Sequence, residues 1–206
     1  MIFQVFLVSY VVSLLGTIPP ATINVTVMQL SLKKKAKSAL SLSLGAAIVD
    51  TTYAGIAVTI QEFLANQIEI TNYFYLLAAL VLITLGILSL IIKPATVDVK
   101  IDDNQQLGFI KGVLLGLFNP LAMPFWLGVT SYLKLHGLID LDGINYWSYV
   151  LGVFLGELTL LGGIVKIGKR FQRVSGNRTI VNVIPGIAFL ILGTVNLIQW
   201  LWFYVE

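Results

Sequence analysis

The chain has 206 residues, of which 57% are hydrophobic and 11% are charged, and it contains no cysteine. Charged residues make up about a quarter of an ordinary soluble domain, so this composition excludes a soluble protein and indicates an integral membrane protein, while the lack of cysteine excludes disulfides and Cys-ligated metal clusters. The net charge of +3 does not indicate nucleic-acid binding, because the basic residues lie in short loops between apolar segments, where they set orientation.

Six apolar segments are long enough to cross a bilayer, which takes about 20 residues. They cover roughly 3–31, 39–61, 73–92, 108–133, 146–166 and 180–204. The connections between them are short. We therefore predict that residues 1–206 form a single, all-helical transmembrane domain with six spans and no soluble module.

The first segment carries a break near its centre, at Gly16-Thr-Ile-Pro-Pro-Ala-Thr-Ile-Asn24. Proline lacks an N–H and clashes with the carbonyl four residues back, so Pro20, which follows Pro19, leaves the carbonyl of Gly16 free. In a membrane such a carbonyl needs a partner from the protein, from water or from a bound ligand. The pattern predicts a discontinuous helix that lines a site, although a single break is also compatible with an ordinary kink.

Two acidic residues lie well inside predicted spans. Asp50 is the midpoint of the second segment, and Glu157 is one residue past the midpoint of the fifth. A charge at the bilayer centre costs about 3 kcal/mol, so these carboxyls are expected to face a cavity or a partner. They can exchange protons or, when ionised, hold an ammonium group or a metal cation. No basic residue lies at this depth, which favours a cation as the partner; neutral carboxyls hydrogen-bonded between helices are the alternative.

The fourth segment contains a second break, Gly116-Leu-Phe-Asn-Pro-Leu-Ala-Met-Pro-Phe-Trp126. By the same argument Pro120 frees the carbonyl of Gly116, and Pro124 frees that of Pro120. Gly116 and Pro120 align with the glycine and the second proline of the first break at an offset of 100 residues. Paired Gly/Pro-interrupted segments in two halves of a membrane protein predict a transporter binding site.

The other segments also repeat. Gly45-x4-Asp50-x4-Gly55 matches Gly152-x4-Glu157-x4-Gly162 at an offset of 107 residues, and Leu-Gly86 in the third segment matches Leu-Gly193 in the sixth at the same offset. Three segments that match in order indicate two repeats, about 1–92 and 108–206. Because each repeat has an odd number of spans, the second copy enters the membrane from the opposite face, which predicts a 3+3 inverted-topology repeat with broken first and fourth helices.

Polar side chains flank both breaks. Thr17 and Asn24 lie at the first break and Asn119 at the second, where they can complete a site with the acids. Helix N-termini after a break suit an anionic group, so breaks and acids together would hold both ends of a zwitterionic amino acid. Hydrogen bonding between helices is the alternative role for these residues.

The basic residues predict the orientation. All but one of the 13 Lys and Arg residues fall in the first, third and fifth loops, at 33–37, 93–111 and 166–178. The excess of positive charge places these loops in the cytoplasm and both termini outside it. Small-residue faces such as those around Gly86 permit a homodimer without requiring one.

The sequence contains no nucleotide-binding loop, no dinucleotide fingerprint, no metalloprotease motif and no nucleophile elbow. We therefore expect no enzyme activity, no catalytic residues, no cofactor and no resident metal ion.

Three stretches carry a likeness to a known family: Gly16-Thr-Ile-Pro-Pro-Ala, Gly45-x4-Asp50 after a basic loop, and Gly112-x3-Gly116-x2-Asn119-Pro120-x-Ala122-x2-Phe125. They resemble the Pro-Gly-Pro break, the second span and the fourth-span Asn-Pro-Lys-Ala-x-x-Phe signature of the lysine-exporter (LysE/RhtB) translocators. The resemblance implies a secondary transporter of the bacterial plasma membrane that exports an amino acid or related amine-bearing metabolite by exchange with protons.

We expect Asp50 to bind the substrate amine or the exchanged proton, with Glu157 as the symmetry-related second acid and the two breaks as gating hinges. The nearest rival is an exporter of divalent or other cations that uses the same acids as oxygen ligands. A membrane enzyme acting on lipid headgroups and a scaffold without transport activity are more distant rivals, since neither has a use for paired breaks and midplane acids.

Overall fold

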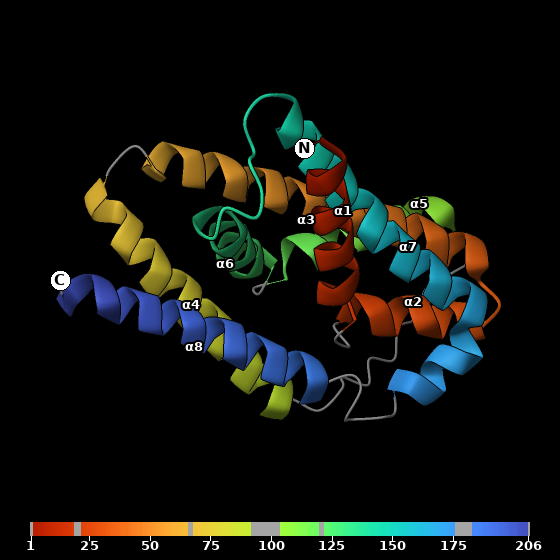
Figure 1. The fold of residues 1–206 in the computed structure, drawn as a ribbon. Coiled ribbons are helices and arrows are strands. Elements are labelled where there is room, and N and C mark those ends of the chain that lie inside the picture. The colour runs from red at the N-terminus through yellow and green to blue at the C-terminus, as the bar shows by residue number, and fades with distance from the viewer. Residues whose placement is uncertain are drawn as a thin grey trace.

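The computed structural model describes residues 2–18, 22–65, 68–91, 104–119, 122–175 and 183–205 (Figure 1). All regular elements in these ranges are helices, as the composition predicts. They are α1 (Ile2–Gly16), α2 (Thr22–Leu32), α3 (Ala36–Ala65), α4 (Ile68–Ile91), α5 (Gln105–Leu117), α6 (Ala122–Leu135), α7 (Ile144–Ser175) and α8 (Ile184–Val205).

Each of the two segments with a predicted break holds two helices. The first contains α1 and α2, which run in different directions in Figure 1. The fourth contains α5 and α6, whose axes are bent by 63° relative to each other. The four remaining segments each contain one helix: α3, α4, α7 and α8.

Helix length decides which elements can cross a membrane alone. Among the described residues, Ala36–Gln61 of α3 and Ile144–Gly168 of α7 are long and apolar enough, and the bent pair α5–α6 makes a third candidate span. The first break divides the first predicted span into two shorter apolar helices, Ile2–Gly16 and Thr22–Leu32. The chain is thus an all-helical membrane protein, and the arrangement of six spans stays a prediction.

The surface and the interior differ in the way expected for helices in lipid. Large apolar side chains lie exposed along the outside of the bundle, among them Phe3, Leu80 and Ile191, whereas a water-soluble protein rarely exposes so much apolar surface. Small hydroxyl side chains are buried instead: Ser9, Ser13, Thr26, Ser38, Ser43, Thr130 and Ser131. Small polar residues at helix contacts let membrane helices approach closely and bond to one another.

Glycines set the closest helix contacts. On α5, Gly108 and Gly112 lie directly against the main chain of α3, because a Cβ at either position would overlap the carbonyl of Ser38 or Leu42. On α7, Gly152 lies in the same way against the carbonyl of Phe6 in α1. Gly152 is therefore a close-packing position between α7 and α1.

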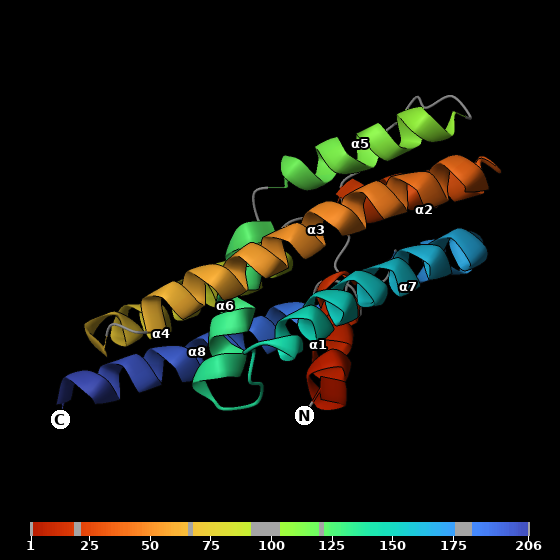
Figure 2. The ribbon, with the colours of Figure 1, turned by 90° about the horizontal axis from the view of Figure 1, so that it is seen from above.

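The helix contacts come in pairs. α1 packs along α7 as α5 packs along α3, and α2 contacts α7 as α6 contacts α3. α4 and α8 pack along each other, and α3 packs on α7, which runs antiparallel to it in Figure 2. Two copies of one unit, α1–α4 and α5–α8, would produce this pattern. Two contacts depart from it in the described ranges. α4 contacts α6 and α2 contacts α3, but the repeat-related pairs, α8 with α2 and α6 with α7, make no contact of similar extent.

Two buried apolar clusters fill the centre of the bundle. The Trp126 cluster comes from α1, α3, α6, α7 and the turn before α7, and it includes Ala54 and Val153. The Leu42 cluster comes from α2, α3 and α7, and it includes Ala46 and Leu161. On both α3 and α7, the two clusters are therefore separated by about two helical turns, and each of these intervals contains one predicted acid.

We predict opposite effects for alanine at two helical glycines. Gly112→Ala places a methyl group against the Leu42 carbonyl, and such overpacking lowers the free energy of unfolding by about 1–3 kcal/mol. Gly162→Ala is the matched control, because a Cβ there meets nothing within 4 Å and removing a helical glycine stabilises by about 0.5–1 kcal/mol. Thermal unfolding of the detergent-solubilised variants measures both. Equal melting temperatures for the two would contradict the assigned α3–α5 contact.

Candidate transport site

The first break is held together by hydrogen bonds from Thr17 and Asn24. Past the end of α1, Thr17 donates from its main-chain N–H and from Oγ1 to the carbonyl of Ser13, at 3.0 and 2.7 Å. From α2, the buried Asn24 donates from Nδ2 to the carbonyl of Thr17. Asn24 thus reaches back across the break and satisfies a carbonyl that a continuous helix would have bonded itself. Pro19 and Pro20 lie outside the described residues.

The second break is closed by the chain itself. The carbonyl of Gly116, which we expected to be free, accepts a hydrogen bond from the N–H of Asn119 at 3.1 Å. The final turn thereby tightens from an i+4 to an i+3 pattern, which is how helix ends commonly satisfy such groups. From α3, Tyr53 donates its hydroxyl to the carbonyl of Leu117 at 3.0 Å. In the described part of this break, the carbonyls of Gly116 and Leu117 are therefore satisfied by the protein itself.

The prolines of the second break differ in what the structure describes. Pro120 lies outside the described residues. Pro124 is the third residue of α6, and proline is tolerated in a first turn because its missing N–H would have no partner in the helix. Asn119 is half-buried just past the end of α5. The gating roles of these residues stay predictions.

Both breaks contact the opposite half of the chain. A Cβ at Gly16, the last residue of α1, would lie 2.5 Å from Cζ of Phe125 in the first turn of α6. A Cβ at Gly116, near the end of α5, would lie 2.9 Å from Cβ of Val49 in α3. The first break is thus seated on the helix that follows the second, and the second break lies beside the residue that precedes Asp50.

The two acids face each other between α3 and α7. The Asp50 and Glu157 side chains are close enough to interact directly, and Asp50 also lies near the side chain of Trp126 on α6. Glu157 is 2% exposed and Trp126 is 1% exposed. Yet Glu157 Oε2 and Trp126 Nε1 complete no hydrogen bond of regular geometry within the described ranges. The acids and Trp126 are therefore in contact without forming regular hydrogen bonds through these two atoms.

Aromatic side chains line one side of the acid pair. The Trp126 and Tyr149 rings pack edge to face with centroids 6.3 Å apart, and Tyr149 shares a hydrogen bond of 2.8 Å with Thr130. Phe125 packs edge to face on Trp126 at 5.0 Å. The Trp126 ring of α6 and the Tyr149 ring of α7 thus lie close to Asp50.

Some of this arrangement was accessible to sequence reasoning and some was not. Asp50 and Glu157 are brought together, while Thr17 and Asn24 bond to main-chain carbonyls at the first break. Trp126 and Tyr149 were not predicted. The sequence did contain a signal for Tyr149, because its spacing of eight residues from Glu157 puts both side chains on one face of a helix. There was no comparable signal for Trp126, because Trp126 comes close to Asp50 only through the contact between α3 and α6.

Comparison with known proteins adds one match. A sequence model of the LysE type translocator family matches residues 14–199, a range that includes both breaks and both acids. No curated protein and no solved structure matches the chain. Because the family match extends over most of the sequence, the chain belongs to the LysE type translocator family.

Proposed function

We propose that this translocator exports an amino acid or a related amine-bearing metabolite across the bacterial plasma membrane, in exchange for protons. The transporting unit is one domain, residues 1–206, built from two inverted repeats of about 1–92 and 108–206 with three spans each. The contact between Asp50 and Glu157 carries the proposal, and family membership supports the export of a small solute.

Two adjacent carboxyls suit the exchange of one cation for another. When both are ionised they repel each other, so the pair favours a proton or another positive charge between them. A substrate ammonium group can take the place of that proton, and the next proton displaces the ammonium group in turn. Within the described ranges, the side chains that interact with the acids are each other, Trp126 and Tyr149. None of these is a lysine or arginine that would compete with the cation.

The substrate carboxylate needs donors, which the breaks supply in this proposal. The first turn of α6 begins at Ala122, and N–H groups at such a helix start carry partial positive charge that suits an anion. Asn119 precedes this turn, and Thr17 and Asn24 lie at the other break. The breaks also serve as hinges. Each break contacts the opposite half of the chain, so a movement of the main chain at one break displaces the helices at the other.

The rival reading as a cation exporter is less well supported. A divalent cation bound by protein takes about six or more oxygen ligands. Within the described residues, no group of three or more His, Asp or Glu side chains lies together. The two acids alone suit an ammonium group better than a hard metal cation.

Export can be tested in proteoliposomes loaded with a mixture of the twenty amino acids under an inward proton gradient. Mass spectrometry follows the loss of each one. We expect proteoliposomes with the wild type to lose selected amino acids, and those with Asp50→Asn to lose them on the order of 100-fold more slowly. The reason is that removing the acid from a buried pair of carboxylate and substrate ammonium costs about 2–5 kcal/mol of binding.

Two controls make the result decisive. Asp142→Asn changes an exposed acid before α7 and should transport like the wild type, and thermal unfolding shows whether Asp50→Asn is folded. Folded Asp50→Asn with wild-type flux would refute the role of the acid pair. Folded wild type that loses no amino acid would refute the substrate class.

The proposed orientation has a separate test, because the chain lacks cysteine and single cysteines report without background. Lys34→Cys lies in the first loop and Asp142→Cys in the turn before α7, both at exposed positions. In right-side-out vesicles, a membrane-impermeant maleimide should label Asp142→Cys at once and Lys34→Cys only after permeabilisation. The reverse pattern would invert the assigned topology.

A further inference from the structure

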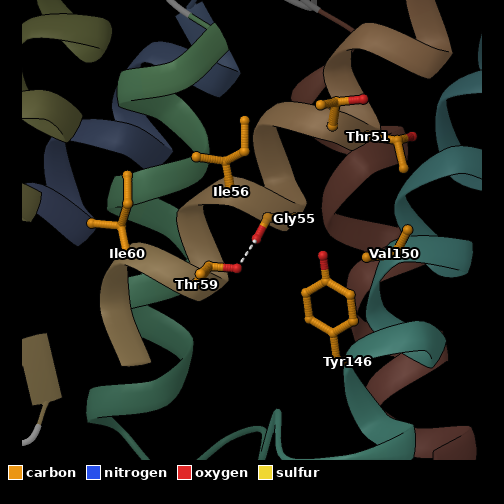
Figure 3. Close-up of a pocket in the computed structure, with 8 residues that line it drawn as sticks. Thr51, Gly55, Ile56, Thr59, Ile60, Tyr146 and Val150 are labelled. Atoms are coloured by element: carbon orange, nitrogen blue, oxygen red, sulfur yellow. Dashed lines mark hydrogen bonds between the residues drawn. The ribbon is translucent and has the colours of Figure 1, made fainter. Parts of the chain in front are cut away.

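A pocket of about 380 Å³ lies between α3 and α7 (Figure 3). Its lining includes Thr51, Gly55 and Thr59 on α3 and Tyr146 and Val150 on α7. Ligand pockets range upward from about 300 Å³, so this one suits a small metabolite. None of its lining residues is charged.

The pocket is next to the acid pair on both helices. On α3 it begins at Thr51, the residue after Asp50, and continues toward the C-terminal end of the helix. On α7 it extends from Val150 to Tyr146, on the N-terminal side of Glu157. Because α3 and α7 run antiparallel (Figure 2), both sets of residues lie on the same side of the acids. In the proposed orientation, that side faces out of the cell.

Hydroxyl groups give the pocket its chemistry. Thr51 Oγ1 is buried without a hydrogen-bond partner in the described part of the chain, although a buried hydroxyl normally has one. Tyr146 points its hydroxyl toward Gly55 (Figure 3), where a Cβ would be 2.8 Å from that oxygen. Thr59 donates to the carbonyl of Gly55 at 3.2 Å. Such groups can bind either end of a zwitterion without holding it tightly.

The other side of the acids is filled. There the space between α2, α3 and α7 is occupied by the Leu42 cluster, in which Leu42 and Leu161 are fully buried. A solute at the acid pair thus has a hydroxyl-lined pocket on one side and a packed apolar cluster on the other.

We propose that this pocket is the outer vestibule of the transporter, a second and weaker binding site that holds the amino acid after it leaves Asp50 and Glu157. This inference rests on the proposed function. It assigns Thr51, Thr59 and Tyr146 to substrate binding through their hydroxyl groups, and it makes the conformation described here the one that opens outward.

The test labels a single cysteine in the vestibule. Thr59→Cys, in right-side-out vesicles, is treated from outside with a membrane-impermeant maleimide, with and without a mixture of the twenty amino acids. We expect labelling from outside that the mixture slows severalfold. Ile60→Cys lines the same pocket and replaces Thr59→Cys if that variant does not fold.

The matched control is Thr159→Cys. Thr159 is also an exposed threonine whose hydroxyl bonds to its own helix, at the carbonyl of Leu155, but it lies on α7 beyond Glu157 and outside the pocket. It should not react with the impermeant reagent from outside, whether or not amino acids are present.

Two outcomes would overturn the vestibule. Absence of labelling at both Thr59→Cys and Ile60→Cys in folded protein would show that the pocket does not open to outer water. Labelling that the amino acids leave unchanged would show that it binds none of them. Since labelling needs no flux, either outcome leaves the export measurement to be judged separately, and protection without export would refute the proposed function while keeping a binding site.

Discussion

The structure depends on placing two carboxyls in the middle of an apolar bundle. A charged group there costs several kcal/mol unless it has a partner, and two ionised carboxyls side by side repel each other, so the pair favours a proton or another cation between them. They meet where the Trp126 cluster gives way to the Leu42 cluster on both α3 and α7. Glu157 is buried and Asp50 is half-buried, so apolar packing along the helices leaves the pair with limited access to water. A transport cycle must therefore control when water and substrate can reach the acids from each side of the membrane.

Close helix packing holds α3 and α7, the helices that carry the acids, against their neighbours α5 and α1. The glycines of α5 and α7 bring main chains into contact, and buried serines bond across the helices, as Ser13 does to the carbonyl of Val153 at 2.8 Å. Between such rigid contacts, the breaks are the places where the main chain changes direction. A cycle in which the break regions tilt while the glycine contacts hold would open one side of the acids and close the other, and the hydroxyl-lined pocket is the opening on the proposed outer side.

Sequence reasoning reached the parts of this account that depend on single residues in a linear pattern. The prolines predicted the ends of α1 and α5, and the central positions of Asp50 and Glu157 in two repeat-related segments predicted one depth for both acids, although not their contact. Sequence reasoning failed where a main-chain group has a second possible hydrogen-bond partner nearby, and where a residue's role depends on contacts between helices that are distant in the sequence. The Gly116 carbonyl is taken by a tighter turn, which no spacing reveals, and the roles of Trp126 and Tyr53 depend on helices that only folding brings together. The predicted repeat and six spans rest on sequence patterns, and the predicted orientation rests on the distribution of charge. The paired helix contacts agree with the predicted repeat.

The central claim is that protons and substrate exchange at one pair of acids, and the most direct measurement follows both at once. Proteoliposomes are loaded with the exported amino acid and a pH-sensitive dye, with no imposed pH gradient and with the voltage clamped by potassium and valinomycin. The account predicts that the interior acidifies as the amino acid leaves, and that Glu157→Gln abolishes the acidification together with the efflux. Efflux at a constant internal pH, or acidification unchanged in Glu157→Gln, would contradict it.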